Sequence, residues 1–211
     1  LAPATCRRLY FRALNRAVIR KLAPCDVFIA MSGIYLEAAE HARKAFGAMV
    51  FLERGSMHVD AQRKILRAVQ SLGPESLITR ERELAGYAAA DRIVVPSFHA
   101  AASFERESCI ANKIIITPYG VDLAMFPAAA TAGVQGRKVL YVGNWTHQKG
   151  VDVLVTALGK IGGAECLHVG AKGNLPFPNS AGFTHHDPVD QRALSAFYRE
   201  ADVFVLPSRQ D

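Results

Sequence analysis

Three residues whose types and spacing suit phosphate binding are Gly143, Lys149 and Gly150. A run of apolar and β-branched residues at 139–142 is typical of a buried parallel strand, and it ends at Gly143. Six residues later, at Lys149-Gly150, a helix begins. At such a junction, backbone N–H groups and the helix dipole can hold a phosphate, and Lys149 adds a full positive charge. The alternative is an ordinary surface loop with a hydrated lysine.

The histidines and cysteines form no pattern typical of a metal site. His168 lies inside a predicted strand, and the neighbours His185 and His186 cannot easily face the same ion. The four cysteines are scattered without a CxxC pair, which supports neither a zinc site nor a disulfide framework. We therefore expect no metal cofactor, and reduced thiols in a cytoplasmic protein.

The positive charge is concentrated at the start of the chain. The sequence has 25 Lys and Arg against 19 Asp and Glu, a net charge of +6, and residues 1–25 hold six bases and no acid. Read as a helix, residues 7–22 place apolar side chains on one face and an arginine at every fourth position on another ridge, at Arg8, Arg12, Arg16 and Arg20.

This basic amphipathic helix, 7–22, could lie on the anionic inner face of a membrane as a peripheral contact, or attract an acidic acceptor. The alternative is a solvated outer layer of an α/β domain. Nucleic acid is not favoured as a partner, because aromatic residues are not interleaved with basic ones as base stacking requires.

Length and composition indicate a globular protein. The chain has 211 residues, of which 50% are apolar, enough for one large or two small domains. It has no apolar run near 18 residues and no signal-peptide pattern, so neither a membrane span nor export is indicated. The first and last residues both interrupt a pattern, and we therefore expect a fragment of a longer protein that is inactive by itself.

Strand-like and helix-like segments alternate along the chain. Before residue 118 the patterns predict strands at 26–31, 48–52, 92–95 and 113–117, and helices over 35–46, 76–90 and 98–109. Such repeated units favour a parallel sheet covered on both faces. Residues 118–136 are rich in Pro, Gly and Ala and predict an interdomain linker. The second sheet is predicted from a strand at 139–142, a helix over 151–161, a strand at 165–169, a loop over 170–182, a helix over 190–201 and a strand at 203–206.

Several motifs in this order resemble the family 4 retaining glycosyltransferases of the GT-B fold. They are ADRIVVPS at 90–97, ITPYGVDLAMF at 116–126, VLYVGNWTHQKGVDVLVTAL at 139–158 and READVFVLPSRQD at 199–211, with LERGSMHVDAQ at 52–62 upstream. The resemblance implies an α/β protein with two Rossmann-like parallel-sheet domains, both incomplete here. Residues 1–117 would be the later part of the acceptor-side domain, 118–136 the linker, and 137–211 the first half of the nucleotide-sugar domain.

The resemblance also implies a donor phosphate site. Lys149 and Gly150 match the family's KG motif, whose lysine contacts the donor's phosphates, and Gly143 matches the glycine where the backbone approaches the ligand closely. Many members have an arginine directly after that glycine, where this chain has Asn144. Another base, or backbone amides, would have to complete the site.

Further roles follow from the same resemblance. Asp211, after Pro207-Ser208, matches the first of two acids eight positions apart, which faces the donor sugar; alternatively it is an exposed terminal residue. His58 resembles a histidine on a loop that faces the cleft near the reacting centre, and its alternative is a loop histidine bonded to backbone. His185 and His186, in a loop at 184–187, would lie near the nucleotide base.

The implied activity is a hexosyltransferase-type glycosyltransferase (EC 2.4). It would move a sugar from a nucleoside-diphosphate sugar to a glycan or lipid-linked acceptor with retention of configuration, as in polysaccharide biosynthesis. Two alternatives remain: a nucleotide-sugar epimerase of the GT-B fold, and a non-catalytic scaffold, which Asn144 suggests. A dinucleotide-dependent oxidoreductase is not favoured, because no GxGxxG motif follows a strand.

Overall fold

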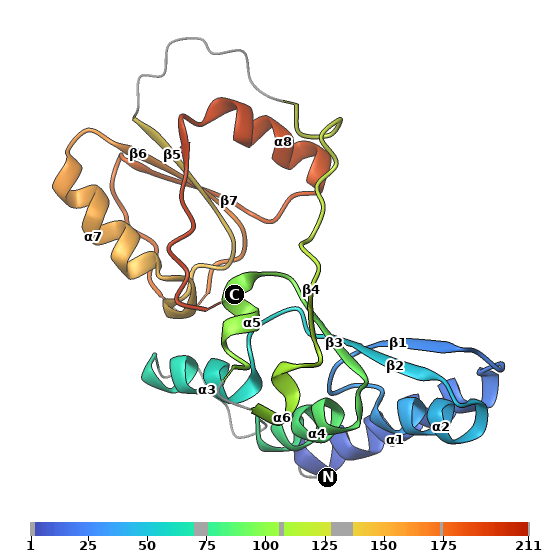
Figure 1. Ribbon diagram of the computed structural model, residues 1–211. Helices are drawn as coiled ribbons and strands as arrows, with labels where there is room; N and C mark the ends of the chain where they lie inside the picture. Colours follow the sequence, from blue (N-terminus) through green and yellow to red (C-terminus); the bar gives the residue numbers. More distant parts are fainter. Residues whose placement is uncertain (1–2, 70–75, 106–107, 128–136, 174, 211) are drawn as a thin grey trace. The chain divides into compact units, whose positions relative to one another are not determined.

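The chain divides into an N-terminal unit, residues 1–119, and a C-terminal unit, residues 120–211 (Figure 1). The computed structural model describes residues 3–69, 76–105, 108–127, 137–173 and 175–210. Each unit has its own four-stranded sheet, in which all pairings are parallel, and its own hydrophobic core. The predicted α/β fold with two parallel sheets is therefore confirmed.

The N-terminal sheet has the strand order β1-β2-β3-β4. Its strands are β1 (Val27–Met31), β2 (Met49–Glu53), β3 (Arg92–Val95) and β4 (Ile114–Ile116). Its helices are α1 (Pro3–Lys21), α2 (Leu36–Phe46), α3 (Val59–Ala68), α4 (Ser76–Ala89), α5 (Phe98–Ala102) and α6 (Ser108–Ala111). Side chains of β1, β2 and β3 alternate between the core and the opposite face, as the pleat of a strand requires.

One face of the N-terminal sheet forms the core, where Ala38, Ala39 and Ala42 of α2 let that helix approach the strands closely. The opposite face exposes apolar side chains: Val27 is 48% exposed, Ile29 62% and Met31 49%. The prediction of helices on both faces is therefore wrong for the described residues of this sheet.

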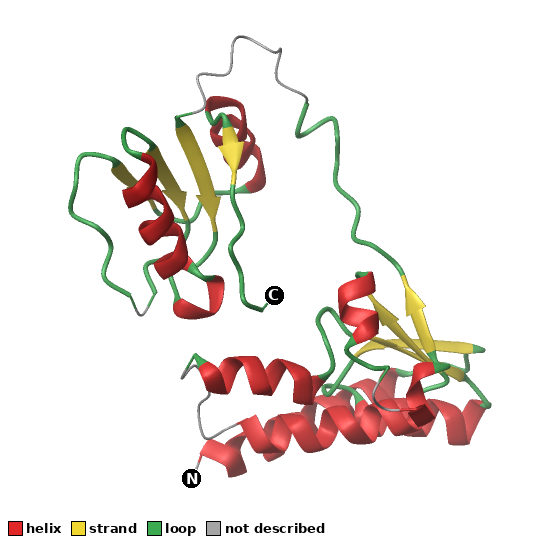
Figure 2. Ribbon diagram, turned by 60° about the vertical axis from the view of Figure 1, so that its left-hand side comes forward, coloured by secondary structure: helices red, strands yellow, loops and turns green. Residues whose placement is uncertain are grey.

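The C-terminal sheet has the order β7-β6-β5-β8. Its strands are β5 (Lys138–Val142), β6 (Glu165–Val169), β7 (Phe183–His186) and β8 (Val203–Phe204), and its helices are the 3₁₀ turn η1 (His147–Lys149), α7 (Val151–Ile161) and α8 (Gln191–Glu200). The two α-helices cover opposite faces (Figure 2). Leu154 and Leu158 of α7 pack in one cluster, and Leu194 and Phe197 of α8 pack against the other.

Two local predictions were wrong, and one helix was missed. Residues 183–186, predicted as a loop in part, form the edge strand β7, where mixed polar side chains hide the strand pattern. The pattern 59–68 was not recognised as a helix, although it forms α3. The helix predicted over 98–109 ends at Ala102; the Ser103 hydroxyl donates to the Ala100 carbonyl (2.5 Å), and Phe104 is fully buried.

Candidate functional site

The loop that follows β5 is held by buried side chains beneath it. The Tyr141 hydroxyl donates to the carbonyl of Asn144 (2.8 Å), and Nε2 of His168 lies 2.8 Å from the carbonyl of Gly143. Both rings are fully buried. Gly143 has φ +144°, and a side chain there would meet the Tyr141 hydroxyl at 3.0 Å. The loop therefore has a fixed shape that requires glycine at its start.

Lys149 lies in the 3₁₀ turn η1, directly before α7. The Thr146 hydroxyl accepts from the Lys149 N–H (3.4 Å), and Gly150 then turns the chain into α7 with φ +71°. A Cβ at Gly150 would lie 2.0 Å from the carbonyl oxygen of Pro207. The sequence thus places a half-buried lysine and the N-terminal end of an 11-residue helix side by side at the carboxyl edge of the sheet.

Arg209, which follows β8 in the chain, holds this turn in place. Its guanidinium forms two hydrogen bonds of 2.7 Å with the carboxylate of Asp152 and a third, of 2.6 Å, with the carbonyl of His147. Its backbone N–H donates to the carbonyl of Gln148 (3.0 Å). The hydrogen bonds from Arg209 lower the pKa of Asp152 to about 2. Because its guanidinium already pairs with Asp152, Arg209 does not simply replace the arginine that many members of the resembling family have where this chain has Asn144.

The two histidines predicted near the nucleotide point to different faces of β7. His185 is half-buried and its Nδ1 lies 2.9 Å from Nδ1 of His168. His186 is exposed, and its ring packs on Phe197 of α8 at 4.9 Å. The alternation of a strand separates these neighbours. His185 therefore contacts the loop at Gly143 only indirectly, through His168, whereas His186 lies on the α8 side of the sheet.

His58 is buried in the N-terminal unit. Its Nδ1 accepts from the Asp60 N–H (3.2 Å) and so caps α3, and its ring packs against Tyr87 and Phe104 at 5.2 and 5.0 Å. Its backbone N–H donates to the Ser103 hydroxyl (2.7 Å). His58 is 3% exposed, so its ring is part of the core. The role that the resemblance implies for it stays a prediction.

A buried ionic cluster anchors the loop that leads to His58. Arg54, at the end of β2, pairs with Glu83 of α4 (3.3 Å) and donates to the carbonyl of Met57 (3.1 Å). Glu83 also accepts from the Ser32 hydroxyl (2.6 Å) and is 4% exposed. Such a buried carboxylate is stable only when it is paired and hydrogen-bonded, as it is here.

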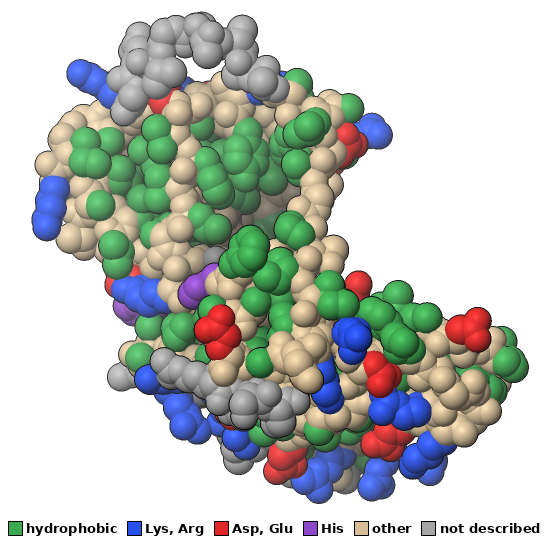
Figure 3. Space-filling model, in the orientation of Figure 1, with side chains coloured by type: hydrophobic (Ala, Val, Ile, Leu, Met, Phe, Trp, Pro, Cys, Tyr) green, Lys and Arg blue, Asp and Glu red, His purple; other side chains and the backbone are tan. Residues whose placement is uncertain are grey.

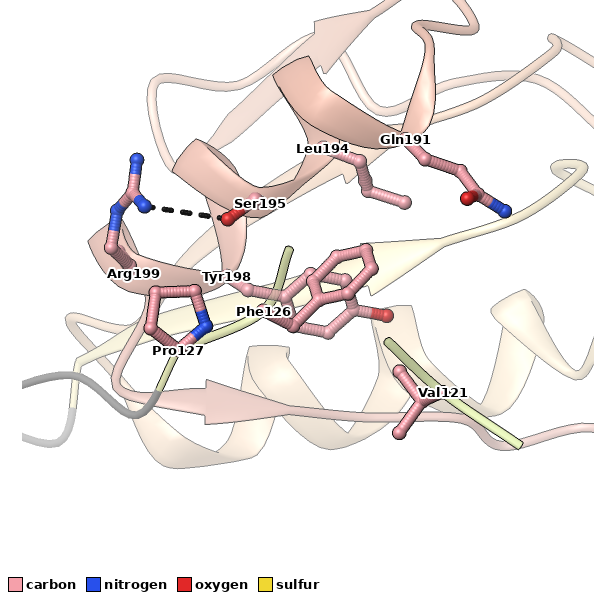
Figure 4. Close-up of a pocket in the computed structure, with 8 residues that line it drawn as sticks. All are labelled: Val121, Phe126, Pro127, Gln191, Leu194, Ser195, Tyr198 and Arg199. Carbon is pink, nitrogen blue, oxygen red and sulfur yellow. Dashed lines mark hydrogen bonds between the residues drawn. The ribbon is translucent and has the colours of Figure 1, made fainter. Parts of the chain in front are cut away.

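Part of the predicted linker packs on the C-terminal unit. The ring of Phe126 lies 5.7 Å from that of Tyr198 in α8, and the two border a pocket of about 440 Å³ (Figure 4). Arg199, on the same helix, donates to the Ser195 hydroxyl at 3.4 Å. The pocket is lined mainly by apolar side chains and lies on the α8 side of the sheet, whereas Lys149 precedes α7. Residues 128–136 of the predicted linker lie outside the described residues.

Asp211 also lies outside the described residues, so its predicted role stays untested. Within the described ranges, no group of three His, Cys, Asp or Glu could hold a metal ion. Sequence reasoning missed Tyr141, His168 as a loop anchor, and Arg209. A histidine in an otherwise apolar strand was the available signal for His168.

Comparison with known proteins adds to this geometry. Residues 136–211 match the model of a family described as "Glycosyl transferases group 1". A curated relative, D-inositol 3-phosphate glycosyltransferase of Arthrobacter sp. (strain FB24), is 28% identical over 183 residues, which cover 72% of this chain and 42% of the relative. These findings support a group 1 glycosyltransferase.

Solved structures share the fold. Sucrose-phosphate synthase from Thermosynechococcus elongatus aligns with a TM-score of 0.65 at 19% identity, covering 94% of this chain and 54% of that one. Anabaena HepE, in complex with UDP and glucose, aligns with a TM-score of 0.64 at 11% identity, covering 94% and 55%. The two parallel-sheet units thus match GT-B glycosyltransferases in fold. The chain spans about half the length of these proteins.

Proposed function

We propose that this chain is part of a glycosyltransferase that moves a hexosyl group from a nucleoside-diphosphate sugar to an acceptor, with retention of configuration. The observation that carries the proposal is the turn 146–150, which sets Lys149 against the start of α7 in a segment that matches the group 1 family. The known relatives support a sugar nucleotide as donor, because HepE was solved with UDP-glucose.

The proposed chemistry depends on positive charge fixed before the reaction. Breaking the bond between sugar and diphosphate leaves negative charge on the departing phosphate, while the sugar becomes oxocarbenium-like. Lys149, Gly150 and the first amides of α7 would hold that phosphate, and preorganised charge of this kind lowers a barrier strongly. With retention, the departing phosphate itself can take the acceptor proton. No metal is needed for this, so activity should survive EDTA.

The acceptor is proposed to be a glycan or a lipid-linked acceptor, used at the cytoplasmic side of the membrane. The curated relative's name indicates a phosphorylated polyol acceptor for that protein, so D-inositol 3-phosphate belongs in the same screen. His58 and Asp211 are proposed to face acceptor and donor sugar, respectively. Since His58 is buried, it would act through the loop 54–58 unless α3 moves.

The test uses the complete protein. Calorimetry with UDP-, GDP- and ADP-glucose should identify one donor that binds, and transfer to acceptors should then be measured by product analysis. Lys149→Ala is expected to reduce kcat by about 10². Lys160→Ala, at the exposed far end of α7, is the matched control and should leave kcat unchanged. Equal rates for Lys149→Ala and wild type would remove Lys149 from the mechanism. An isomerised donor without any acceptor would instead indicate an epimerase, and binding without transfer a scaffold.

We also propose that the outer face of α1 contacts an anionic membrane surface. In the structure, Arg12, Arg16 and Arg20 are exposed beside Leu9 (49% exposed) and Tyr10 (62%), while Phe11 is buried. Figure 3 shows Lys and Arg side chains gathered along the lower edge of the N-terminal unit, with some acids between them. A helix face that exposes Leu and Tyr among basic side chains is typical of a helix lying on an anionic membrane surface. None of the described helices is long and apolar enough to cross a membrane.

Vesicle binding tests this contact. Vesicles of phosphatidylcholine with phosphatidylglycerol should bind the protein, and pure phosphatidylcholine should not. At about 1 kcal/mol for each basic residue, replacing Arg12, Arg16 and Arg20 with Gln should weaken binding about 100-fold. The control replaces three exposed bases elsewhere, Lys64, Lys160 and Arg192. Equal loss in both triple variants would mean that only net charge matters.

A further inference from the structure

Two histidines, the buried His168 and the half-buried His185, connect to the backbone of the loop 143–150, the proposed phosphate loop. His168, in β6, has its Nε2 2.8 Å from the carbonyl oxygen of Gly143 and its Nδ1 2.9 Å from Nδ1 of His185, in β7. His168 is fully buried, and its ring stacks with those of Tyr141 (5.5 Å) and Phe177 (5.7 Å). Gly143, His168 and His185 therefore form a continuous chain of polar contacts from the edge strand to the loop.

The chemistry of the three groups fixes where the protons are. A carbonyl oxygen only accepts, so Nε2 of His168 must carry a proton. Burial lowers the pKa of His168, which keeps this ring neutral, and its Nδ1 is then an acceptor. Nδ1 of His185 must therefore donate. The remaining nitrogen, Nε2 of His185, is buried and lies 3.3 Å from a carboxylate oxygen of Asp187.

This arrangement determines how the peptide after Gly143 is turned. In a trans peptide the C=O and the following N–H point in opposite directions. Because His168 binds the Gly143 carbonyl on the inner side of the loop, the Asn144 N–H is directed away from His168, to the outer side. Tyr141 holds the next carbonyl, that of Asn144, on the inner side as well.

We propose that His168 is a positioning residue that aims the Asn144 backbone N–H at the donor's diphosphate, and that His185 holds His168 in the required tautomer. The inference rests on the proposed function. It gives a physical reason why this chain can have Asn144 where the resembling family has an arginine: a fixed amide dipole provides part of what the guanidinium would provide. Tyr141 and His168, both buried under this loop, each hold one of its carbonyls, those of Asn144 and Gly143.

The first experiment reads the tautomers without any ligand. In ¹⁵N NMR spectra of the complete protein, His168 should be protonated at Nε2 and His185 at Nδ1. In the variant His185→Phe, which removes the donor to His168, the Nδ1-protonated form of His168 should appear. A His168 protonated at Nδ1 in the wild type would overturn the proposal, because that ring could not donate to Gly143.

The second experiment measures donor binding by calorimetry, with whichever of UDP-, GDP- or ADP-glucose the wild type binds. His168→Leu should weaken binding about tenfold, as expected for one hydrogen bond to a charged group. His168→Gln keeps an N–H donor and should recover most of the affinity. The Asn144 amide signal should shift when the donor binds to the wild type, and should shift much less in His168→Leu.

The matched control separates positioning from packing. Cys166→Ala removes a buried side chain from the same face of β6 and should lower the thermal midpoint while leaving donor affinity unchanged. Wild-type affinity in His168→Leu, or an equal loss in Cys166→Ala, would refute the positioning role while leaving the proposed function intact. If the wild type binds none of the three nucleotide sugars, the proposed function fails, and the positioning role fails with it.

Discussion

Gly150 occupies a backbone position that a residue with a side chain can fill only under strain. It has φ +71°, and a Cβ there would lie 2.0 Å from the Pro207 carbonyl oxygen. Gly150→Ala should therefore reduce the free energy of unfolding by about 2 kcal/mol. Gly159, near the other end of α7, has open space around it, and Gly159→Ala should instead stabilise by about 1 kcal/mol. Urea unfolding measures both changes; equal effects of the two substitutions would contradict this account.

The pair of Asp152 and Arg209 predicts a dependence on pH. The pKa of Asp152 is lowered from 3.8 to about 2, chiefly by hydrogen bonds from Arg209. A carboxyl group whose pKa is lower in the folded state stabilises it above the unfolded pKa, and this contribution is lost as the pH falls through the folded pKa. Since the Asp152 side chain is 36% exposed, solvent screening reduces the gain.

The measurable outcome is a stability difference between wild type and Asp152→Asn. It should be constant from pH 7 to about pH 5, fall below about pH 4 and be mostly lost at about pH 2. Urea unfolding at a series of pH values gives this difference. A difference at pH 2 as large as at pH 7 would show that the substitution acts through packing and not through charge.

Sequence patterns predicted individual residues only where the interaction is local. The spacing of Gly143, Lys149 and Gly150 was readable because strand end, turn and helix start are adjacent in the chain. The partners of Arg209 are 57 and 62 residues away, and the two histidine contacts span 25 and 17 residues. Nothing in a single sequence indicates which distant side chains will meet, so these distant supports of the loop were missed.

At the scale of elements, Asn15 fastens α1 to the body of its unit. Its amide donates to the carbonyls of Phe11 (2.8 Å) and Ile34 (2.9 Å), and its oxygen accepts from the Ala38 N–H (3.0 Å). Asn15→Leu has a similar volume but leaves buried backbone groups without these bonds. The free energy of unfolding should fall by about 2 kcal/mol, measured by circular dichroism in urea. Arg16→Gln, next to it on the exposed side, should have little effect.

Strands and helices with a clear period were predicted within one or two residues, as for β1, β2 and α7. The strand β7 was missed because Phe183 and His185 face one side while Thr184 and His186 are exposed, a weak alternation for an edge strand. The uncovered face of the N-terminal sheet was also missed. Continuous apolar strands predict two covered faces, and only coordinates show which face is open.

For the whole molecule, the two units should respond separately to damage. The chain has one tryptophan, Trp145, which is 1% exposed in the core of the C-terminal unit. Its fluorescence should therefore report Gly150→Ala and be insensitive to Asn15→Leu, whereas circular dichroism should detect both. In the double variant the two losses should add within about 0.5 kcal/mol. A shift of the Trp145 transition in Asn15→Leu would show that the units unfold as one.

The dependence of the turn 147–150 on Pro207, Arg209 and Gln210 has a consequence for biosynthesis. Gln148 and Gln210, which are joined by a hydrogen bond of 2.6 Å, are made 62 residues apart. While the ribosome is still adding those residues, Lys149 lies on a turn whose anchors have not yet been made. If Lys149 binds the donor phosphate as proposed, a polypeptide that stops before residue 207 should bind the donor poorly even where its N-terminal α/β unit folds.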